Sequence, residues 1–208
     1  MIMIEQNPLT PAADFTYLES TVSSTVKIDK ELRNRLGKAS AAYGKLQHRL
    51  WNNRHVSIRV KCKVYRAVVL SSLLYGAEAW TIYRTQVKKL SAFMMRQLRD
   101  IMSVKWYDKI TNEEILRRAN MPCMADILIE RNLRWLGHVH RMDDDRLPKQ
   151  LLYSQLKEGK RNQGRPRLRF KDVAKRNMKW RDINTSSWQT LAGNRVARRT
   201  ATKSKPKP

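Results

Sequence analysis

The apolar positions of this chain recur at steps of three and four residues over most of its length, which is the spacing of one face of an α-helix. The first such stripe follows Asp29, a residue type that caps helix N-termini, and runs to Leu50. A second stripe runs from about Ser57 to Trp80, and its latter half is apolar on every side. We therefore expect this second helix to be the most buried element of a mainly α-helical fold.

Further helices follow, and residue types suited to helix ends set their limits. Thr85 is suited to cap a third helix, Thr111 and Glu114 form a capping-box pattern before a short fourth, and Pro148 fits the first turn of a later one. The predicted ranges are 85–101, 111 to before Pro122, 124 to the acidic run at 143–145, 147–157, 170–180 and 188–199.

The amino-terminal residues 1–24 have a different pattern. Residue types common in β-strands lie on both sides of a loop that contains Pro8 and Pro11, and the two prolines prevent a helix there. This pattern predicts two short strands. The expected fold class is thus mainly α, a helical bundle of about seven helices with a short amino-terminal β-hairpin.

Charge changes this picture, because the chain carries 43 Lys and Arg against 18 Asp and Glu, a formal net charge of +25 at pH 7. Its distribution is uneven: residues 1–26 hold three acidic side chains and no basic one, whereas residues 141–208 hold twenty basic against six acidic side chains. A positive field of this size attracts polyanions. RNA or DNA, contacted through its backbone, is therefore the expected partner.

The basic side chains are densest between Lys157 and Arg181, where eleven Lys and Arg stand against two acidic residues. Gly164 and Pro166 hold part of this segment extended, and alternate residues of an extended backbone fall on one side, where guanidinium groups can clamp successive phosphates. The candidate nucleic-acid-binding residues are Lys160, Arg161, Arg165, Arg167, Arg169, Lys171, Lys175 and Arg176. The alternative interpretation is a solvated basic loop without a specific partner.

Five motifs are spread along nearly the whole chain. They are Phe-Thr-Tyr-Leu-Glu-Ser at 15–20, Leu-Leu-Tyr-Gly-Ala-Glu-Ala-Trp at 73–80, Ile-Thr-Asn-Glu-Glu-Ile-Leu at 110–116, Arg-Trp-Leu-Gly-His-Val-His-Arg-Met at 134–142 and Gly-Lys-Arg-Asn-Gln-Gly-Arg-Pro-Arg at 159–167. Their order and spacing resemble the end of non-LTR retrotransposon endonuclease-reverse transcriptases. One departure is Glu19, where that family usually has glycine.

The resemblance implies the last palm strands, the thumb and a carboxy-terminal extension of a reverse transcriptase, which are parts that grip template and primer. It divides the chain into a β-hairpin remnant of the palm edge (1–26), a thumb-like helical domain (27–105), a second helical segment (106–158), a basic extension with two helices (159–200) and a disordered tail (201–208). The family's endonuclease, fingers and palm have no counterpart in these residues. We therefore expect a non-catalytic fragment.

The residues themselves also argue against a catalytic or metal site. Polymerases of this type hold two metal ions with paired aspartates at a strand turn, whereas the acidic run at 143–145 follows a helix and is typical of a helix exit. Cys123, His138 and His140 are zinc-ligand types, but the two histidines point to different faces and a fourth ligand is not obvious. We expect no metal, no cofactor and no small-molecule substrate.

Cysteine usage and hydropathy bear on the location of the protein. The two cysteines lack the spacing of a disulfide scaffold or a metal knuckle, which suits a reducing compartment. The longest uncharged run, residues 67–77, is too short to span a bilayer, and the first residues lack the order of a signal peptide. The expectation is an intracellular protein, nuclear or cytoplasmic, without a membrane partner.

Three other interpretations stay open at this point. The helices around 110–142 have the order of a helix-turn-helix, which would make the chain a domesticated DNA-binding regulator. A second is an intact enzyme whose start codon was assigned inside a longer reading frame. A third is a decayed element without function.

Overall fold

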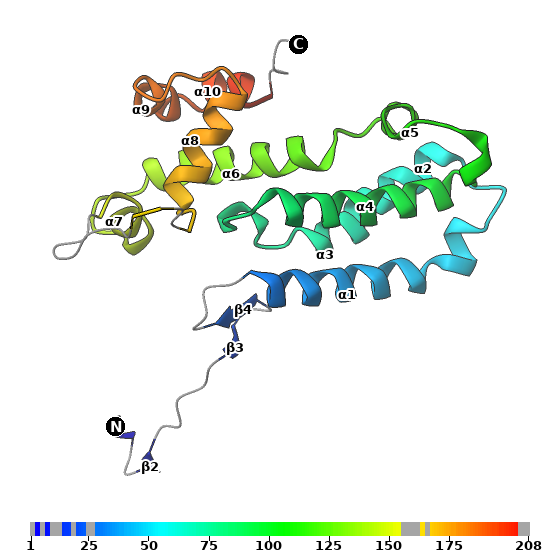
Figure 1. Cartoon of the computed structure of the whole chain (residues 1–208), viewed down its shortest axis with the longest axis horizontal. Helices are drawn as coiled ribbons and strands as arrows, with labels where there is room; N and C mark the ends of the chain where they lie inside the picture. Colours follow the sequence, from blue (N-terminus) through cyan, green and yellow to red (C-terminus); the bar gives the residue numbers. More distant parts are fainter. Residues whose placement is uncertain are drawn as a thin grey trace.

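The computed structural model describes residues 3–4, 7–8, 14–17, 20–23, 28–154, 163–164 and 167–203, and these are mainly α-helical (Figure 1). The predicted fold class is confirmed. The long helices are α1 (Asp29–Lys45), α4 (Arg84–Ile101) and α6 (Met124–His140). Shorter helices cross or extend them.

Short antiparallel strand pairs precede the helices. β1 (Met3–Ile4) pairs with β2 (Asn7–Pro8), and β3 (Asp14–Tyr17) pairs with β4 (Ser20–Ser23). Hydrogen bonds fix β4 to α1: the backbone N–H of Thr21 donates to Glu31 Oε2 at 2.7 Å, and Asn34 Nδ2 donates to Thr21 Oγ1 at 2.8 Å. An amino-terminal hairpin is therefore present as predicted, but β3 and β4 both follow the loop that contains Pro8 and Pro11 instead of flanking it. This hairpin docks on the start of the first helix.

The second predicted helix is divided by changes in its backbone geometry. α2 (Ile58–Val64) passes into the π-helical turn η2 (Tyr65–Leu70) and then α3 (Ser71–Leu73). Gly76, at a φ of +72°, ends this run before the 3₁₀ turn η3 (Ala77–Ala79). The segment contributes fully buried side chains to the core, as expected, but Val68 and Tyr75 are 40% and 48% exposed. Ala67 is exposed too, so the prediction of burial on every side is wrong for these three residues, because α1 packs on η2 and α3 from one side.

The first residues of α1 and α4 show why cap residues are hard to place from sequence. Asp29 is the first residue of α1 and Ile28 is its N-cap. The Asp29 carboxylate instead accepts a hydrogen bond from Gln86 Nε2 at 3.2 Å. At α4, the Gln86 side chain accepts from the backbone N–H of Tyr83 at 3.0 Å, so Tyr83 rather than Thr85 is the N-cap.

The remaining helices complete the carboxy-terminal half. In chain order the remaining elements are η1 (Gln47–Trp51), η4 (Trp106–Asp108), α5 (Asn112–Ala119), α7 (Leu147–Tyr153), α8 (Phe170–Trp180), α9 (Trp188–Gly193) and α10 (Arg195–Lys203). The last helix runs past residue 200, where a tail was predicted to begin. Residues 204–208 lie outside the described part of the chain.

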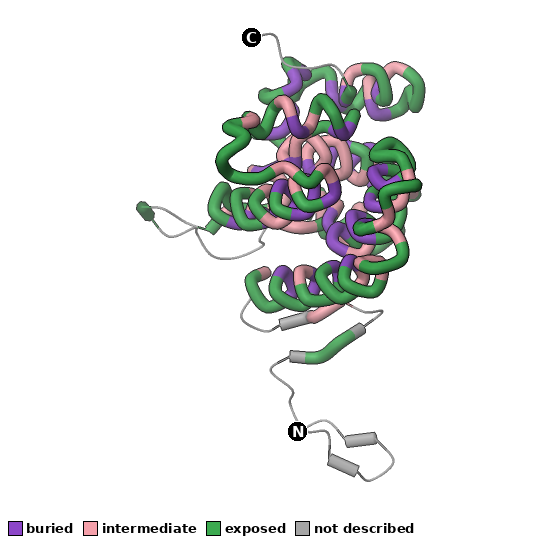
Figure 2. The backbone as a smooth tube through the Cα atoms, turned by 90° about the vertical axis from the view of Figure 1, so that its right-hand side faces the viewer, coloured by how far each residue is buried: buried purple, intermediate pink, exposed green. Residues whose placement is uncertain are grey.

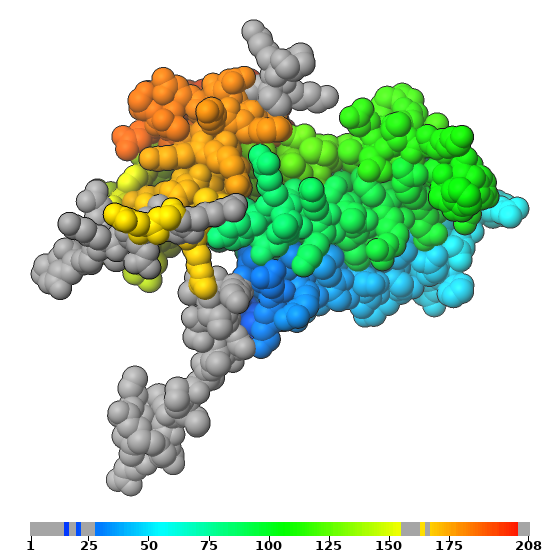
Figure 3. Space-filling model, viewed as in Figure 1, coloured from blue at the N-terminus to red at the C-terminus, as the bar shows by residue number. Residues whose placement is uncertain are grey.

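Two apolar cores lie along the molecule, and α6 takes part in both (Figures 1 and 2). Met124 and Leu128 pack into the core of helices α1 to α5, whereas Leu133 and Leu136 pack with Met178 and its neighbours in the second core. Helices α8, α9 and α10 contact α6, as do η3 and α4. On the face shown in Figure 3, α8 adjoins the start of α4. Over the described ranges, no helix has both the length and the apolar character needed to cross a bilayer.

Candidate nucleic-acid interface

The described part of the predicted basic segment forms the approach to α8 and the helix itself. Lys160, Arg161 and Arg165 lie outside the described residues. The other predicted binding residues are Arg167 and Arg169 before α8, and Lys171, Lys175 and Arg176 within it. All of these except the half-buried Lys171 are exposed.

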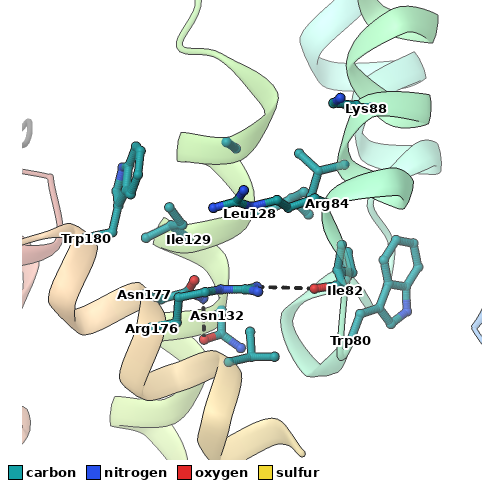
Figure 4. A pocket seen from close by; sticks show the side chains of 14 residues that line it. Trp80, Ile82, Arg84, Lys88, Leu128, Ile129, Asn132, Arg176, Asn177 and Trp180 are labelled. Atoms are coloured by element: carbon teal, nitrogen blue, oxygen red, sulfur yellow. Dashed lines mark hydrogen bonds between the residues drawn. The ribbon is translucent and has the colours of Figure 1, made fainter. Parts of the chain in front are cut away.

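Two of these cations hold α8 in place by donating to backbone carbonyl groups. Lys171 Nζ donates to the Ser154 carbonyl at 3.2 Å, which ties α8 to the end of α7. Arg176 Nη2 donates to the Ile82 carbonyl at 3.2 Å, which ties α8 to the loop before α4 (Figure 4). Lys175 is exposed and has no ion-pair partner among the described residues. Lys171 and Arg176 are thus structural cations, whereas Lys175 is open to solvent.

The sequence of α8 explains its start and its orientation. Asp172 Oδ2 accepts the backbone N–H of Arg169 at 2.9 Å, which satisfies a donor that the helix itself leaves unpaired. The buried positions share one face, which packs on α6. They are Val173, Ala174, Asn177 and Met178. Lys175 and Lys179 are exposed, so the amphipathic pattern sets the cations outward.

An apolar groove of about 290 Å³ lies between α8, α6 and the start of α4 (Figure 4). Ile82, Leu128 and Ile129 supply much of its wall. Asn177 Nδ2 donates to Asn132 Oδ1 at 3.0 Å, so these two lining amides are paired with each other. The groove therefore offers apolar surface to a ligand and little hydrogen-bonding specificity.

Cationic and aromatic side chains surround this groove. Arg84 and Lys88, one turn apart on α4, line it together with Arg176 of α8, Trp80 and Trp180. The three cations are exposed, and Trp180 is 56% exposed. Aromatic faces stack on unpaired bases and cations neutralise phosphates, so this combination is typical of surfaces that bind single-stranded nucleic acid.

Sequence reasoning missed four of these side chains, Arg84, Lys88, Trp80 and Trp180. The four-residue spacing of Arg84 and Lys88 places them on one helical face and was visible in the sequence. Their nearness to α8 was not visible, because the contact between Arg176 and Ile82 joins positions 94 residues apart. Only the packing of both helices on α6 brings the groups together.

The surface of α6 bears on the helix-turn-helix interpretation. Every residue of α6 is described, and only Arg134 and His138 of this helix are exposed. Helices α8, α9 and α10 contact it, and so does η3. A recognition helix needs an open face that can enter the major groove. The geometry of α6 is that of a core helix and does not favour this interpretation.

The structure separates the candidate zinc ligands. Cys123 is the N-cap of α6, with its Sγ 3.1 Å from Asp126 Oδ2, whereas His138 and His140 lie in the last turn of that helix. With a rise of about 1.5 Å per residue, roughly 22 Å of helix lies between them. Burial raises the pKa of the Cys123 thiol. Among the described residues, no three His, Cys, Asp or Glu side chains come together as metal ligands.

The acidic run at 143–145 forms an exposed turn after α6. Asp144 Oδ1 lies 2.7 Å from Lys149 Nζ, and this hydrogen bond lowers the pKa of the Asp144 carboxyl group. The three carboxylates follow a helix rather than a strand. They occupy a helix exit, as the sequence indicated.

Comparison with known proteins bears on the origin of the chain. No protein-family model matches it, and no solved structure matches it. A Caenorhabditis elegans protein described as transposon-derived and uncharacterized is 26% identical over 203 residues, an alignment that covers 92% of this chain and 72% of the relative. This likeness supports a transposon-related origin for the chain.

Proposed function

We propose that this chain is a non-catalytic part of a retroelement reverse transcriptase, and that it binds single-stranded RNA or DNA at the groove between α4, α6 and α8. The observation that carries the proposal is the set of exposed cations around an apolar groove, together with the exposed Trp180 and the half-buried Trp80. The net charge of +25 supports a polyanionic partner. The five motifs described above support the reverse transcriptase assignment, and the transposon-derived relative agrees with that origin.

The chemistry of the groove favours contact with the backbone and with unstacked bases. A space of about 290 Å³ is near the lower end for small-ligand sites and accommodates a single base better than a duplex. Trp180 offers a face for stacking, while Arg84 and Lys88 lie where phosphates of the same strand would pass. Because Asn132 and Asn177 are bonded to each other, these two amides have fewer groups left to read a base edge. Binding should therefore depend little on sequence.

A charge-matched pair of variants tests the cationic side of the groove. Arg84→Ala with Lys88→Ala removes two charges at the groove, and Arg33→Ala with Lys45→Ala removes two exposed charges on α1. Fluorescence anisotropy with a labelled single-stranded oligonucleotide, measured over a series of salt concentrations, should show a salt slope smaller by about 1.4 in the first variant only. Equal effects in both variants would show that net charge alone drives binding.

A pair of tryptophan variants tests the stacking side of the groove. Trp180→Ala should weaken single-strand binding by about 1–3 kcal/mol, the cost of one lost base stack, and this loss should persist at high salt. Trp106→Ala is the matched control, because Trp106 is 88% exposed and lies outside the groove. If both variants bind as tightly as the parent chain, Trp180 does not stack on a base.

The non-catalytic part of the proposal has its own test. Primer extension with the chain, a primed template, Mg²⁺ and nucleotides should yield no template-directed product, because the described residues hold no cluster of carboxylates suited to two metal ions. A product that depends on template sequence would overturn this part. The binding part of the proposal is tested independently by the measurements described above.

A further inference from the structure

A second hollow, of about 390 Å³, lies between the carboxy-terminal half of α6, η3 and α10, away from the groove just described. It is lined by five arginines and one carboxylate. These are Arg131, Arg134, Arg141, Arg195, Arg198 and Glu78. We call this set the arginine pocket. Arg134 and Arg141, with Gly137 between them, belong to the motif at 134–142, for which the proposed function offers no role.

The backbone of α6 is shaped to admit Arg198. A Cβ atom at Gly137 would lie 2.5 Å from Arg198 Cδ, so only glycine lets this side chain lie across the helix. Arg198 Nη1 donates to the Arg134 carbonyl at 2.8 Å. The residue is only 8% exposed, and its Nε has no hydrogen-bond partner within the described part of the chain. A buried guanidinium N–H without an acceptor is costly, and it leaves Arg198 as a buried positive charge in the wall of the pocket.

Like charges crowd this pocket without enough counter-charge. Burial lowers the pKa of Arg198, and the neighbouring Arg141, Arg134 and Arg195 lower it further. Burial and Arg195 likewise lower the pKa of Arg141. Arginine stays charged in proteins, so these shifts represent the cost of burying the guanidinium groups, with a smaller contribution from repulsion between them, rather than lost protons.

The one carboxylate lies beside a single member of the set. Glu78 Oε2 is 3.9 Å from Arg131 Nη1, at the limit of an ion pair. Arg141 Nη1 uses one of its donors on the Ala192 carbonyl at 2.6 Å, which fixes the guanidinium in place. The exposed Arg134 and Arg195 stand at the rim. Several guanidinium donors thus converge on one space with one acidic group at its margin.

We propose that the arginine pocket binds a phosphate group. Guanidinium forks match the geometry of phosphate oxygens, and Arg134 and Arg195 are exposed at the pocket, where a phosphate can reach them. Trp135 and His138, whose rings lie 5.5 Å apart, complete the wall. The site lies outside the groove of the proposed function, so it goes beyond that function and does not require it.

Two sources share this chemistry, a free phosphate and a phosphodiester of nucleic acid. A neighbouring hollow of about 460 Å³ shares His138, Arg141 and Arg195 with the arginine pocket and adds Arg146 and Asp143. This continuation of cations suits successive phosphates of a strand. The experiment below has one arm for each source.

The first arm measures the melting temperature of the full chain with inorganic phosphate against chloride at equal ionic strength. Phosphate at about ten times its Kd should raise the melting temperature of the parent chain by about 3–5 °C. Arg134→Ala with Arg195→Ala should weaken this effect by about tenfold in phosphate concentration. The control, Arg33→Ala with Arg199→Ala, removes the same exposed charge outside the pocket and should behave as the parent.

The second arm measures binding of a single-stranded oligonucleotide without a terminal phosphate. If strand phosphates enter the pocket, the Arg134→Ala, Arg195→Ala variant should lose affinity and about 1.4 of salt slope, whereas the control should lose neither. If affinity is unchanged while the phosphate effect on melting is lost, the ligand is free phosphate.

Equal melting shifts in the parent, pocket and control chains would overturn the proposal, since phosphate would then act without a site. Circular dichroism confirms folding, and Arg195→Ala alone serves if the double variant does not fold, because Arg195 is exposed. The Arg84→Ala, Lys88→Ala variant must keep the full phosphate shift. Failure of the groove proposal is thereby separated from failure of this one.

Discussion

Replacing Gly137 with alanine should destabilise the protein, although alanine is the better helix former. In an exposed helix interior, glycine to alanine gains about 1 kcal/mol. At position 137 the new Cβ would meet Arg198 Cδ at 2.5 Å and Arg198 Nη1 at 3.1 Å. The Cδ atom lies in the middle of the side chain, so Arg198 cannot simply turn its end away. It must leave its position on α6.

The size of the effect follows from what Arg198 would lose. The charged Arg198 side chain donates a 2.8 Å hydrogen bond to the Arg134 carbonyl. Hydrogen bonds that involve a charged group contribute about 1.5–3 kcal/mol. Overpacking of a buried contact costs about 1–3 kcal/mol more where relaxation is incomplete. After subtraction of the helix-propensity gain of about 1 kcal/mol, the expected loss is about 1.5–5 kcal/mol in the free energy of unfolding.

Two control variants test whether the close contact with Arg198 is the cause of the destabilisation. Gly37 lies within α1 with nothing within 4 Å of an added Cβ, so Gly37→Ala should stabilise by up to about 1 kcal/mol. In a chain that already carries Arg198→Ala, the Gly137→Ala change should also stabilise, because the clash is gone. Urea unfolding followed by circular dichroism measures all of these. If Gly137→Ala matches Gly37→Ala in sign, the close approach of Arg198 to α6 is refuted.

Three further predictions concern binding and stability. Replacing five cations of the basic segment with alanine should flatten the salt dependence of duplex binding by about 0.9 per lost phosphate contact, and an unchanged slope would exclude this segment. The five are Lys160, Arg161, Arg165, Arg167 and Arg169. Tyr43→Phe removes a 2.6 Å hydrogen bond to Asp100 and should cost about 1–2 kcal/mol in urea unfolding, whereas no change would show that water replaces the bond. Burial raises the pKa of Tyr43 and of Tyr65 above the ordinary value of 10.0. The folded state therefore holds these two protons more tightly than the unfolded state does. The free energy of unfolding should be at its full value below pH 10 and should fall as the pH rises further. Phenolate absorbance that appears before the protein unfolds would contradict this prediction.

The sequence determined the helices well, because burial of one face imposes a period that can be read directly. Thr111 was placed correctly as a cap, and its Oγ1 accepts the backbone N–H of Glu114 at 3.3 Å. The sequence did not predict the interruptions within these helices, because the periodicity of apolar residues does not change there. A π-helical turn at 65–70 keeps the apolar run continuous, and the break between α9 and α10 depends on Asn194, whose Oδ1 accepts the backbone N–H of Val196 at 3.0 Å.

For the candidate sites, too, the sequence predicted some features, whereas others follow only from the packing of the helices. Charge and composition alone indicated a polyanionic partner, because net charge is a sum that does not depend on folding. The predicted basic segment also contained Arg176, one of the groove residues. Arg84 and Lys88 could not be joined to it, since their nearness to Arg176 exists only after α4 and α8 pack on α6.

The arginine pocket lay beyond sequence reasoning for the same physical reason. Gly137 and Arg198 are far apart in the chain, and a glycine inside a predicted helix gives no sign of which side chain will lie against it. The sequence by itself thus determined which segments are helical and which charge they carry. The tertiary structure alone decided which cations converge, because convergence depends on contacts between distant helices and on the space that one missing Cβ leaves open.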